Sequence, residues 1–331
     1  MAMIPPERGL QVAADLQARF ERTDVAYKTV NNTPIETAIF VPSTLSSGAG
    51  AKTDAPVPVL VHFHGGGLIL GAFPEPFFLT DWVRDLVHTT PCIFVSPGYR
   101  LIPEARAVDI LDDVADFWTW LHAHLPAAIH ARWPHLTPDL ARVAAVGESA
   151  GGYLALQSAL LFNGAAKLRA VIAQYPAMYP DLAGFSPSPP AADPALAAVV
   201  TDYIKAIQPG AVRVSTPWPE KAELVVAAVG SGLIRELYGE DKEGRLTLAY
   251  ALAKAEEVPP PIWVIQGDED FMVPKAGADE MVERMKKERP TAVVKYTVRP
   301  GGHGFDAIDT LEDDWVKEGV DFAKGYWLRL R

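Results

Sequence analysis

Residues 143–152 have the sequence Val-Ala-Ala-Val-Gly-Glu-Ser-Ala-Gly-Gly, in which a short apolar run leads directly into a serine between glycines. From Tyr153 to Gln157 the chain continues with residues that favour a helix. The pattern Gly-x-Ser-x-Gly at a strand-to-helix junction forms a sharp, strained turn that tolerates only small neighbours of the serine. Such a turn exposes the hydroxyl near the positive end of the helix dipole. The stretch therefore predicts a strand, a helix and a nucleophilic serine, Ser149, between them.

Short apolar runs bounded by turn residues recur along the chain. Beside 143–147 they occupy residues 57–64, 92–96, 170–175, 262–266 and 293–298. Runs this short and this continuously apolar are typical of strands buried on both faces of a parallel sheet. Apolar residues at helical spacing fill much of the intervening chain, at 107–124, 276–288 and 311–330. The alternation predicts an α/β fold with a mostly parallel central sheet flanked by helices. A hairpin from residues 25–30 and 35–41 is expected at one sheet edge.

Two regions depart from this alternation. Residues 1–22 have the pattern of a helix ahead of the first strand, and residues 178–257 form a long insertion between two strands. A structureless loop of that length is rare in a compact domain, so we expect the insertion to carry its own helices after a proline-rich start. The remaining chain then forms one core in two parts, residues 23–177 and 258–331.

Composition narrows the range of partners. The formal net charge is −11, with 41 acidic against 30 basic residues, which argues against nucleic acid and anionic membrane surfaces. Cys92 is the only cysteine, so no disulfide forms within the chain, in agreement with a reducing compartment. We see neither a signal peptide nor eighteen consecutive apolar residues, and no membrane span is expected. The sequence thus predicts a soluble, cytoplasmic protein, and a homodimer is compatible with it.

A serine nucleophile needs a base and an acid that orients the base. In this type of fold both follow the serine, first the acid and then the histidine, each beyond the end of a strand. His303 is the only histidine after Ser149, and it lies between glycines beyond the run 293–298. Beyond the run 262–266, three acidic residues compete for the role of the acid: Asp268, Glu269 and Asp270.

Acyl transfer also needs hydrogen-bond donors for the oxyanion of the tetrahedral intermediate. His64-Gly65-Gly66-Gly67 follows the predicted strand 57–64 directly, and glycines allow backbone N–H groups to face a substrate oxygen. We expect the amides of Gly65 and Gly66, together with that of Ala150, to form the oxyanion hole.

Together these motifs resemble the hormone-sensitive-lipase-like branch of the α/β-hydrolases, a group of serine esterases. The matching stretches are His64–Gly67, Tyr99–Glu104, Gly147–Gly152 and Gly302–Phe305. The pattern Gly-x-x-Asp-x-x-Val-Pro, common in these hydrolases, falls on Gly267, Asp270, Val273 and Pro274, and it favours Asp270 as the acid. The resemblance implies an α/β-hydrolase fold with a helical cap, formed here by residues 1–22 and 178–257. It also implies esters with short to medium acyl chains as substrates.

Two positions differ from the family pattern. Gly98 stands where the family usually has the Asp of Asp-Tyr-Arg, and Glu148 stands where many members have Asp. We therefore expect a supporting polar contact beneath the glycine loop to be absent or replaced.

The expected function is a serine carboxylesterase that needs no cofactor and acts on a small ester. Phe73, Phe77 and Phe78 follow the glycine loop and are candidates for lining the substrate pocket, although they could equally be packing aromatics. A lactonase, an amidase or a natural-product tailoring hydrolase would use the same residues. A non-catalytic binding protein on this fold is the alternative from another class, which the complete set of Ser149, an acid and His303 disfavours. No metal site is expected, because no histidine and carboxylate cluster has ligand spacing.

Overall fold

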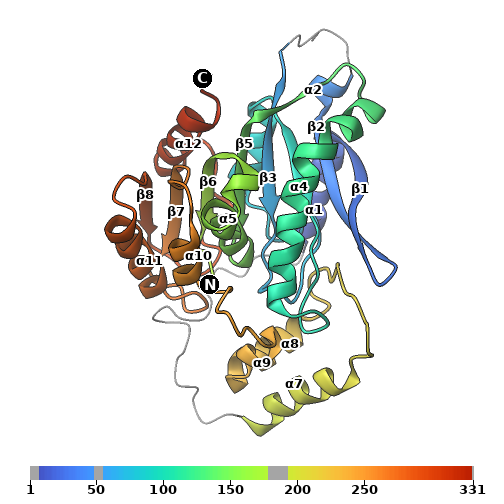
Figure 1. Cartoon of the computed structure of the whole chain (residues 1–331), viewed down its shortest axis with the longest axis vertical. Coiled ribbons are helices and arrows are strands. Elements are labelled where there is room, and N and C mark those ends of the chain that lie inside the picture. Colours follow the sequence, from blue (N-terminus) through green and yellow to red (C-terminus); the bar gives the residue numbers. More distant parts are fainter. Residues whose placement is uncertain (1–6, 48–54, 178–192, 330–331) are drawn as a thin grey trace.

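The computed structural model describes residues 7–47, 55–177 and 193–329, and they form one eight-stranded sheet with helices on both faces (Figure 1). The strands are β1 (Phe20–Val30), β2 (Thr33–Pro42), β3 (Val57–Phe63), β4 (Ile93–Pro97), β5 (Pro138–Glu148), β6 (Leu168–Gln174), β7 (Ile262–Gly267) and β8 (Val294–Arg299). Their order is β1-β2-β4-β3-β5-β6-β7-β8. The β1–β2 and β2–β4 pairs are antiparallel, and all later pairs are parallel. The predicted edge hairpin and mostly parallel sheet are confirmed.

Each face of the sheet has its own apolar core. The helices are α1 (Arg8–Arg19), α2 (Ser43–Ser46), α3 (Asp81–Thr89), α4 (Ala107–Arg132), α5 (Ala150–Leu160), α6 (Asn163–Ala166), α7 (Pro194–Ala206), α8 (Ala222–Ser231), α9 (Ile234–Tyr238), α10 (Leu248–Lys254), α11 (Lys275–Glu288) and α12 (Asp314–Trp327). Buried residues of α4, α5, α10 and α11 pack on one face, and those of α1, α3 and α12 pack on the other. Both faces of the central strands are therefore covered, which explains why these strands are continuously apolar.

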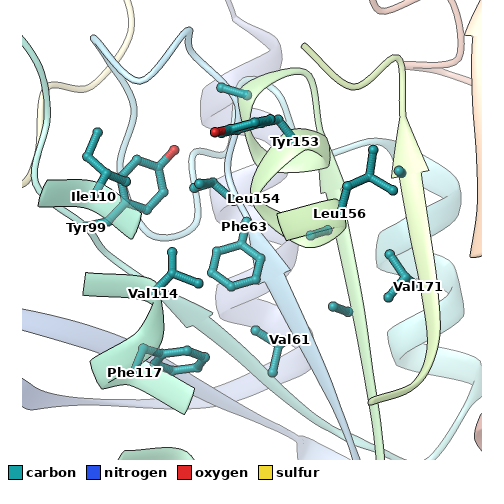
Figure 2. Packing of buried hydrophobic residues seen from close by; sticks show 14 of the residues in the cluster. Val61, Phe63, Tyr99, Ile110, Val114, Phe117, Tyr153, Leu154, Leu156 and Val171 are labelled. Carbon is teal, nitrogen blue, oxygen red and sulfur yellow. The ribbon is translucent and has the colours of Figure 1, made fainter. Parts of the chain in front are cut away.

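Packing on the first face fixes the strand that leads into the glycine loop. Phe63, the last residue of β3, lies between α4 and α5 (Figure 2). Its ring meets that of Phe117 edge-on, with the ring centroids 6.1 Å apart. Because close-packed side chains resist movement, the chain leaves β3 from a fixed point.

The two segments outside the predicted alternation have different places in the fold. α1 ends at Arg19 and β1 begins at Phe20, so the last three residues of the predicted N-terminal segment 1–22 belong to the sheet. In the predicted insertion 178–257, α7, α8 and α9 form a group beyond one end of the sheet (Figure 1). α10 instead packs against α5 and α11. The proline-rich start at 178–192 lies outside the described residues.

Candidate active site

Ser149 lies in the turn between β5 and α5. Its backbone has φ +55° and ψ −118°, a region that non-glycine residues rarely adopt. A Cβ atom on Gly151 would lie 1.9 Å from the carbonyl oxygen of Phe63, so only glycine fits there. The Ser149 N–H donates to the Gln174 carbonyl oxygen at 2.9 Å, which ties the turn to the end of β6. The strained backbone is therefore held by close packing from both neighbouring strands.

The structure brings the three predicted catalytic side chains into one chain of hydrogen bonds. His303 Nε2 lies 3.0 Å from Ser149 Oγ, and His303 Nδ1 lies 2.8 Å from Asp270 Oδ2. The other carboxylate oxygen, Oδ1, accepts from the backbone N–H groups of Met272 at 3.0 Å and Val273 at 2.8 Å. Those two amides fix the carboxylate, which can then hold the imidazole with Nδ1 protonated and Nε2 free to accept from the serine.

The other two acidic candidates lie apart from this chain of hydrogen bonds. Asp268 and Glu269 are exposed, whereas Asp270 is buried. Asp268 accepts from the Gly301 N–H at 3.1 Å, so it supports the loop that carries His303.

The glycine loop after β3 changes the predicted oxyanion set. The Gly65 N–H donates to Glu148 Oε1 at 2.8 Å, so its hydrogen is directed at a carboxylate inside the protein. The prediction that Gly65 is an oxyanion donor is therefore wrong. Its N–H instead anchors the loop to Glu148. Gly66 and Gly67 both have positive φ, +103° and +66°. Ala150 is the first residue of α5, where a backbone N–H has no partner within the helix. Gly66 and Ala150 remain from the predicted set, and Gly67, which was not predicted from the sequence, is a further candidate.

His64 supports the loop through its ring and its backbone. Its Nδ1 lies 2.7 Å from the Gly65 carbonyl oxygen, and the ring stacks on Tyr99 with the centroids 4.3 Å apart. The Tyr99 hydroxyl donates to the His64 carbonyl oxygen at 2.7 Å. Burial lowers the pKa of His64 to about 3, so the ring is neutral at ordinary pH. A neutral Nδ1–H can donate to the loop carbonyl without placing a charge beside the site.

A buried carboxyl group three residues after His303, that of Asp306, was not predicted from the sequence. Asp306 accepts from Trp82 Nε1 at 3.0 Å and from Gln174 Nε2 at 2.8 Å. Burial raises the pKa of Asp306 to about 6, although hydrogen bonds from Trp82, Gln174 and Tyr175 oppose the rise. The Tyr175 ring in turn meets the His303 ring edge-on at 4.8 Å. Only the position of Asp306, three residues after the histidine, could have drawn attention to it.

The aromatic candidates for the substrate pocket have different surroundings. The Phe77 ring stacks on Trp218 with centroids 5.0 Å apart, and Phe78 meets Trp218 edge-on at 6.1 Å. Phe73 instead covers Gly98, where a Cβ atom would lie 2.7 Å from its ring. Trp218, in the insertion, was missed because a single aromatic residue in an unmatched segment carries no pattern.

The insertion is attached to the loops that follow β3 and β4. Gly71 and Thr216 form an isolated antiparallel bridge. The Gly71 N–H donates to the Thr216 carbonyl oxygen with an N to O distance of 2.7 Å, and the Thr216 N–H donates back to Gly71 at 2.9 Å. Lys221 Nζ lies 2.7 Å from Glu104 Oε2, and both side chains are less than a tenth exposed. The Tyr203 hydroxyl donates to Glu104 Oε1, also at 2.7 Å. Buried polar contacts therefore hold α7 and α8 over the carboxyl ends of these strands.

Within 7–47, 55–177 and 193–329, no group of three or more His, Cys, Asp or Glu side chains is arranged to hold a metal ion. Across the same ranges, none of the helices has the length and apolar character needed to cross a bilayer.

Comparison with known proteins agrees with the fold and the motifs. The model of a family described as having the alpha/beta hydrolase fold matches residues 60–306. A probable carboxylesterase, M8, from a Phoma species is 32% identical over 325 residues, covering 94% of this chain and 97% of that protein. Probable carboxylesterase clz11 from Cochliobolus lunatus is 34% identical over 192 residues, covering 55% of this chain and 85% of that protein.

Among solved structures, vibralactone cyclase aligns with a TM-score of 0.63 at 17% identity, covering 99% of this chain and 86% of that one. A thermostable esterase from Pseudomonas putida aligns with a TM-score of 0.58 at 19% identity, covering 98% and 90%. At these identities the two structures show the fold alone. The chain thus belongs to the α/β-hydrolase fold family, in its hormone-sensitive-lipase-like branch.

Proposed function

We propose that this chain hydrolyses carboxylic esters of short to medium acyl chain length, with Ser149 as nucleophile, His303 as base and Asp270 as the acid that orients His303. The class of enzyme, a serine carboxylesterase, follows from family membership together with the carboxylesterase relatives. The observation that carries the residue roles is the continuous chain of hydrogen bonds from Ser149 Oγ to Asp270, at 3.0 and 2.8 Å.

The geometry supports a two-step acyl transfer. Ser149 Oγ attacks the ester carbonyl carbon while His303 Nε2 takes the hydroxyl proton. The resulting oxyanion is stabilised by the amides of Gly66, Gly67 and Ala150. Collapse breaks the bond to the alcohol, which leaves with the proton from His303. Water, activated by His303, then attacks the acyl-enzyme and releases the carboxylic acid and the free serine.

The acyl chain length rests on the resemblance and on the aromatic side chains near the glycine loop. Phe77 and Phe78 supply apolar surface together with Trp218 of the insertion. Phe73 contributes less, because its ring fills the space over Gly98. The cap role of residues 1–22 and 178–257, the homodimer and the cytoplasmic location stay predictions.

Turnover of p-nitrophenyl acetate, butyrate and octanoate by the native chain and by Ser149→Ala tests the proposal. We expect hydrolysis of the first two, a decline at octanoate, and loss of turnover in the variant by a factor on the order of 10⁵ or more. Hydrolysis of butyrolactone, followed by acid release, and of butyramide, followed by ammonia release, separates an esterase from a lactonase and an amidase. Equal turnover by native chain and variant would contradict the role of Ser149.

A further inference from the structure

A buried histidine and a buried glutamate lie beneath the glycine loop, and the reaction described above uses neither. His62 is on β3 and Glu148 is the last residue of β5, two neighbouring parallel strands. His62 Nε2 lies 2.8 Å from Glu148 Oε2. Their side chains are 0% and 4% exposed. Burying two such polar groups is costly, and each is offset here by the other as its partner. A buried pair that takes no part in the chemistry calls for a structural role.

Glu148 links the glycine loop after β3 to the turn that carries Ser149 and Ala150, the two segments whose amides face the developing oxyanion. It directly precedes Ser149, and its Oε1 accepts from the Gly65 N–H at 2.8 Å. A Cβ atom on Gly65 would lie 3.1 Å from the Glu148 carbonyl oxygen, so the glycine loop lies close against the serine turn. One carboxylate therefore connects the loop that carries Gly66 and Gly67 to the turn that carries Ala150.

His62 has a fixed orientation of its own. Its Nδ1 lies 3.4 Å from Ser96 Oγ on β4, and its ring packs on Phe94 with the centroids 5.6 Å apart. The Ser96 hydroxyl also lies 3.2 Å from the His62 carbonyl oxygen, within donating distance. Contacts with Ser96 and Phe94 of β4 thus set the ring before it meets Glu148.

No acidic side chain can reach the loop from position 98 in this chain. A Cβ atom there would lie 2.7 Å from the Phe73 ring and 3.0 Å from the Glu36 carbonyl oxygen. The Tyr27 hydroxyl donates to the Gly98 carbonyl oxygen at 2.7 Å. The support expected from that position has to come from another residue.

We propose that Glu148, oriented by His62, is the positioning residue that sets the oxyanion loop against the serine turn, in place of an acid at position 98. The proposal rests on the proposed function. Glu148 acts through the Gly65 backbone, so its loss misaligns amides that matter only when the oxyanion forms. The expected kinetic signature is a lower kcat with little change in KM.

Three variants test this. Glu148→Ala removes both hydrogen bonds, and we expect kcat for p-nitrophenyl butyrate to fall about 10²-fold at nearly constant KM. Glu148→Gln can still accept from the Gly65 N–H and can donate to the other tautomer of His62, so we expect kcat within about tenfold of the native value. Asp113→Asn is the control, because Asp113 is equally buried but pairs with Arg100 and Lys28. It should leave kcat unchanged.

A second readout does not depend on ester turnover. Hydrogen exchange of the peptide that covers residues 64–70 should accelerate in Glu148→Ala and remain native in Glu148→Gln. Should the alanine variant fail to fold, Glu148→Asp carries the same test, because its carboxylate is one methylene too short to reach both partners. If the loop exchanges faster in Glu148→Ala but the native chain hydrolyses no ester, the proposed function is contradicted and the positioning role is not. Native exchange and native kcat in Glu148→Ala would overturn the positioning role.

Discussion

The two sides of the site are built in different ways. On the sheet side, Ser149, Asp270 and His303 each follow the carboxyl end of a strand, where neighbouring backbone groups fix them. On the other side, the Lys221–Glu104 ion pair and the bridge between Gly71 and Thr216 attach the insertion to the loops after β4 and β3, and apolar residues of α7–α10 join the core. The geometry of Ser149, Asp270 and His303 thus depends on the sheet and its loops, whereas the position of the insertion depends on side-chain contacts with those loops and with the core.

This difference leads us to expect separable effects. A change among the residues that follow β5, β7 and β8 should act on the chemical step. A change among the contacts of the insertion should act on stability and on substrate binding. Such a separation is expected because only interactions made in the transition state raise kcat, whereas uniform binding alters KM.

The largest effect is expected on the sheet side, from Asp270→Asn. The amide cannot hold the imidazole with Nδ1 protonated, so kcat should fall by about 10⁴ while the fold is retained. The matched control is Asp268→Asn, which changes an exposed acid two residues earlier in the same loop. Steady-state kinetics with p-nitrophenyl butyrate measure both. A larger loss in the control than in Asp270→Asn would contradict the assignment of the acid.

On the insertion side, Lys221→Met breaks a buried ion pair and leaves Glu104 without its closest cation. Removing one partner of such a pair costs about 3–5 kcal/mol, so urea unfolding should show a loss of this size. KM should rise while kcat changes little. Lys205→Met, on the exposed face of α7, is the control and should be neutral. If kcat fell as it does in Asp270→Asn, the two sides of the site would not be separable.

A smaller effect is expected from pH, through Asp306 on the sheet side. Burial raises the pKa of Asp306 to about 6, so on raising the pH the unfolded chain loses this proton first. Its contribution to stability is therefore fully present below about pH 4 and is lost as pH rises to about 6, by roughly 3 kcal/mol.

Asp306→Asn removes this titration, because the amide carries no charge at any of these pH values. Urea unfolding of the native chain and the variant at pH 4.5 and pH 7.5 provides the measurement. The variant should gain stability relative to the native chain as the pH rises. A difference that does not change with pH would show that Asp306 titrates normally.

The sequence predicted the sheet side well because its constraints are local. Continuous apolar runs identified the strands, and the order of Ser149, Asp270 and His303 along the chain follows from the fold. The prediction of Gly65 as an oxyanion donor was wrong because its N–H donates to Glu148, at the end of β5. The glycine motif alone does not reveal this contact, since Glu148 lies far away in the sequence. Trp218, Lys221 and Asp306 were missed because their partners lie far away in the sequence. Such contacts depend on how the elements pack.

The most direct test of the nucleophile is covalent labelling with a fluorophosphonate, followed by intact-mass and peptide analysis. An activated serine displaces fluoride from the probe, so the chain should gain one phosphonyl group on the peptide that contains Ser149. Ser149→Ala should gain none. Absence of labelling in the native chain, or a label on another residue, would contradict the assignment of Ser149 as the activated nucleophile.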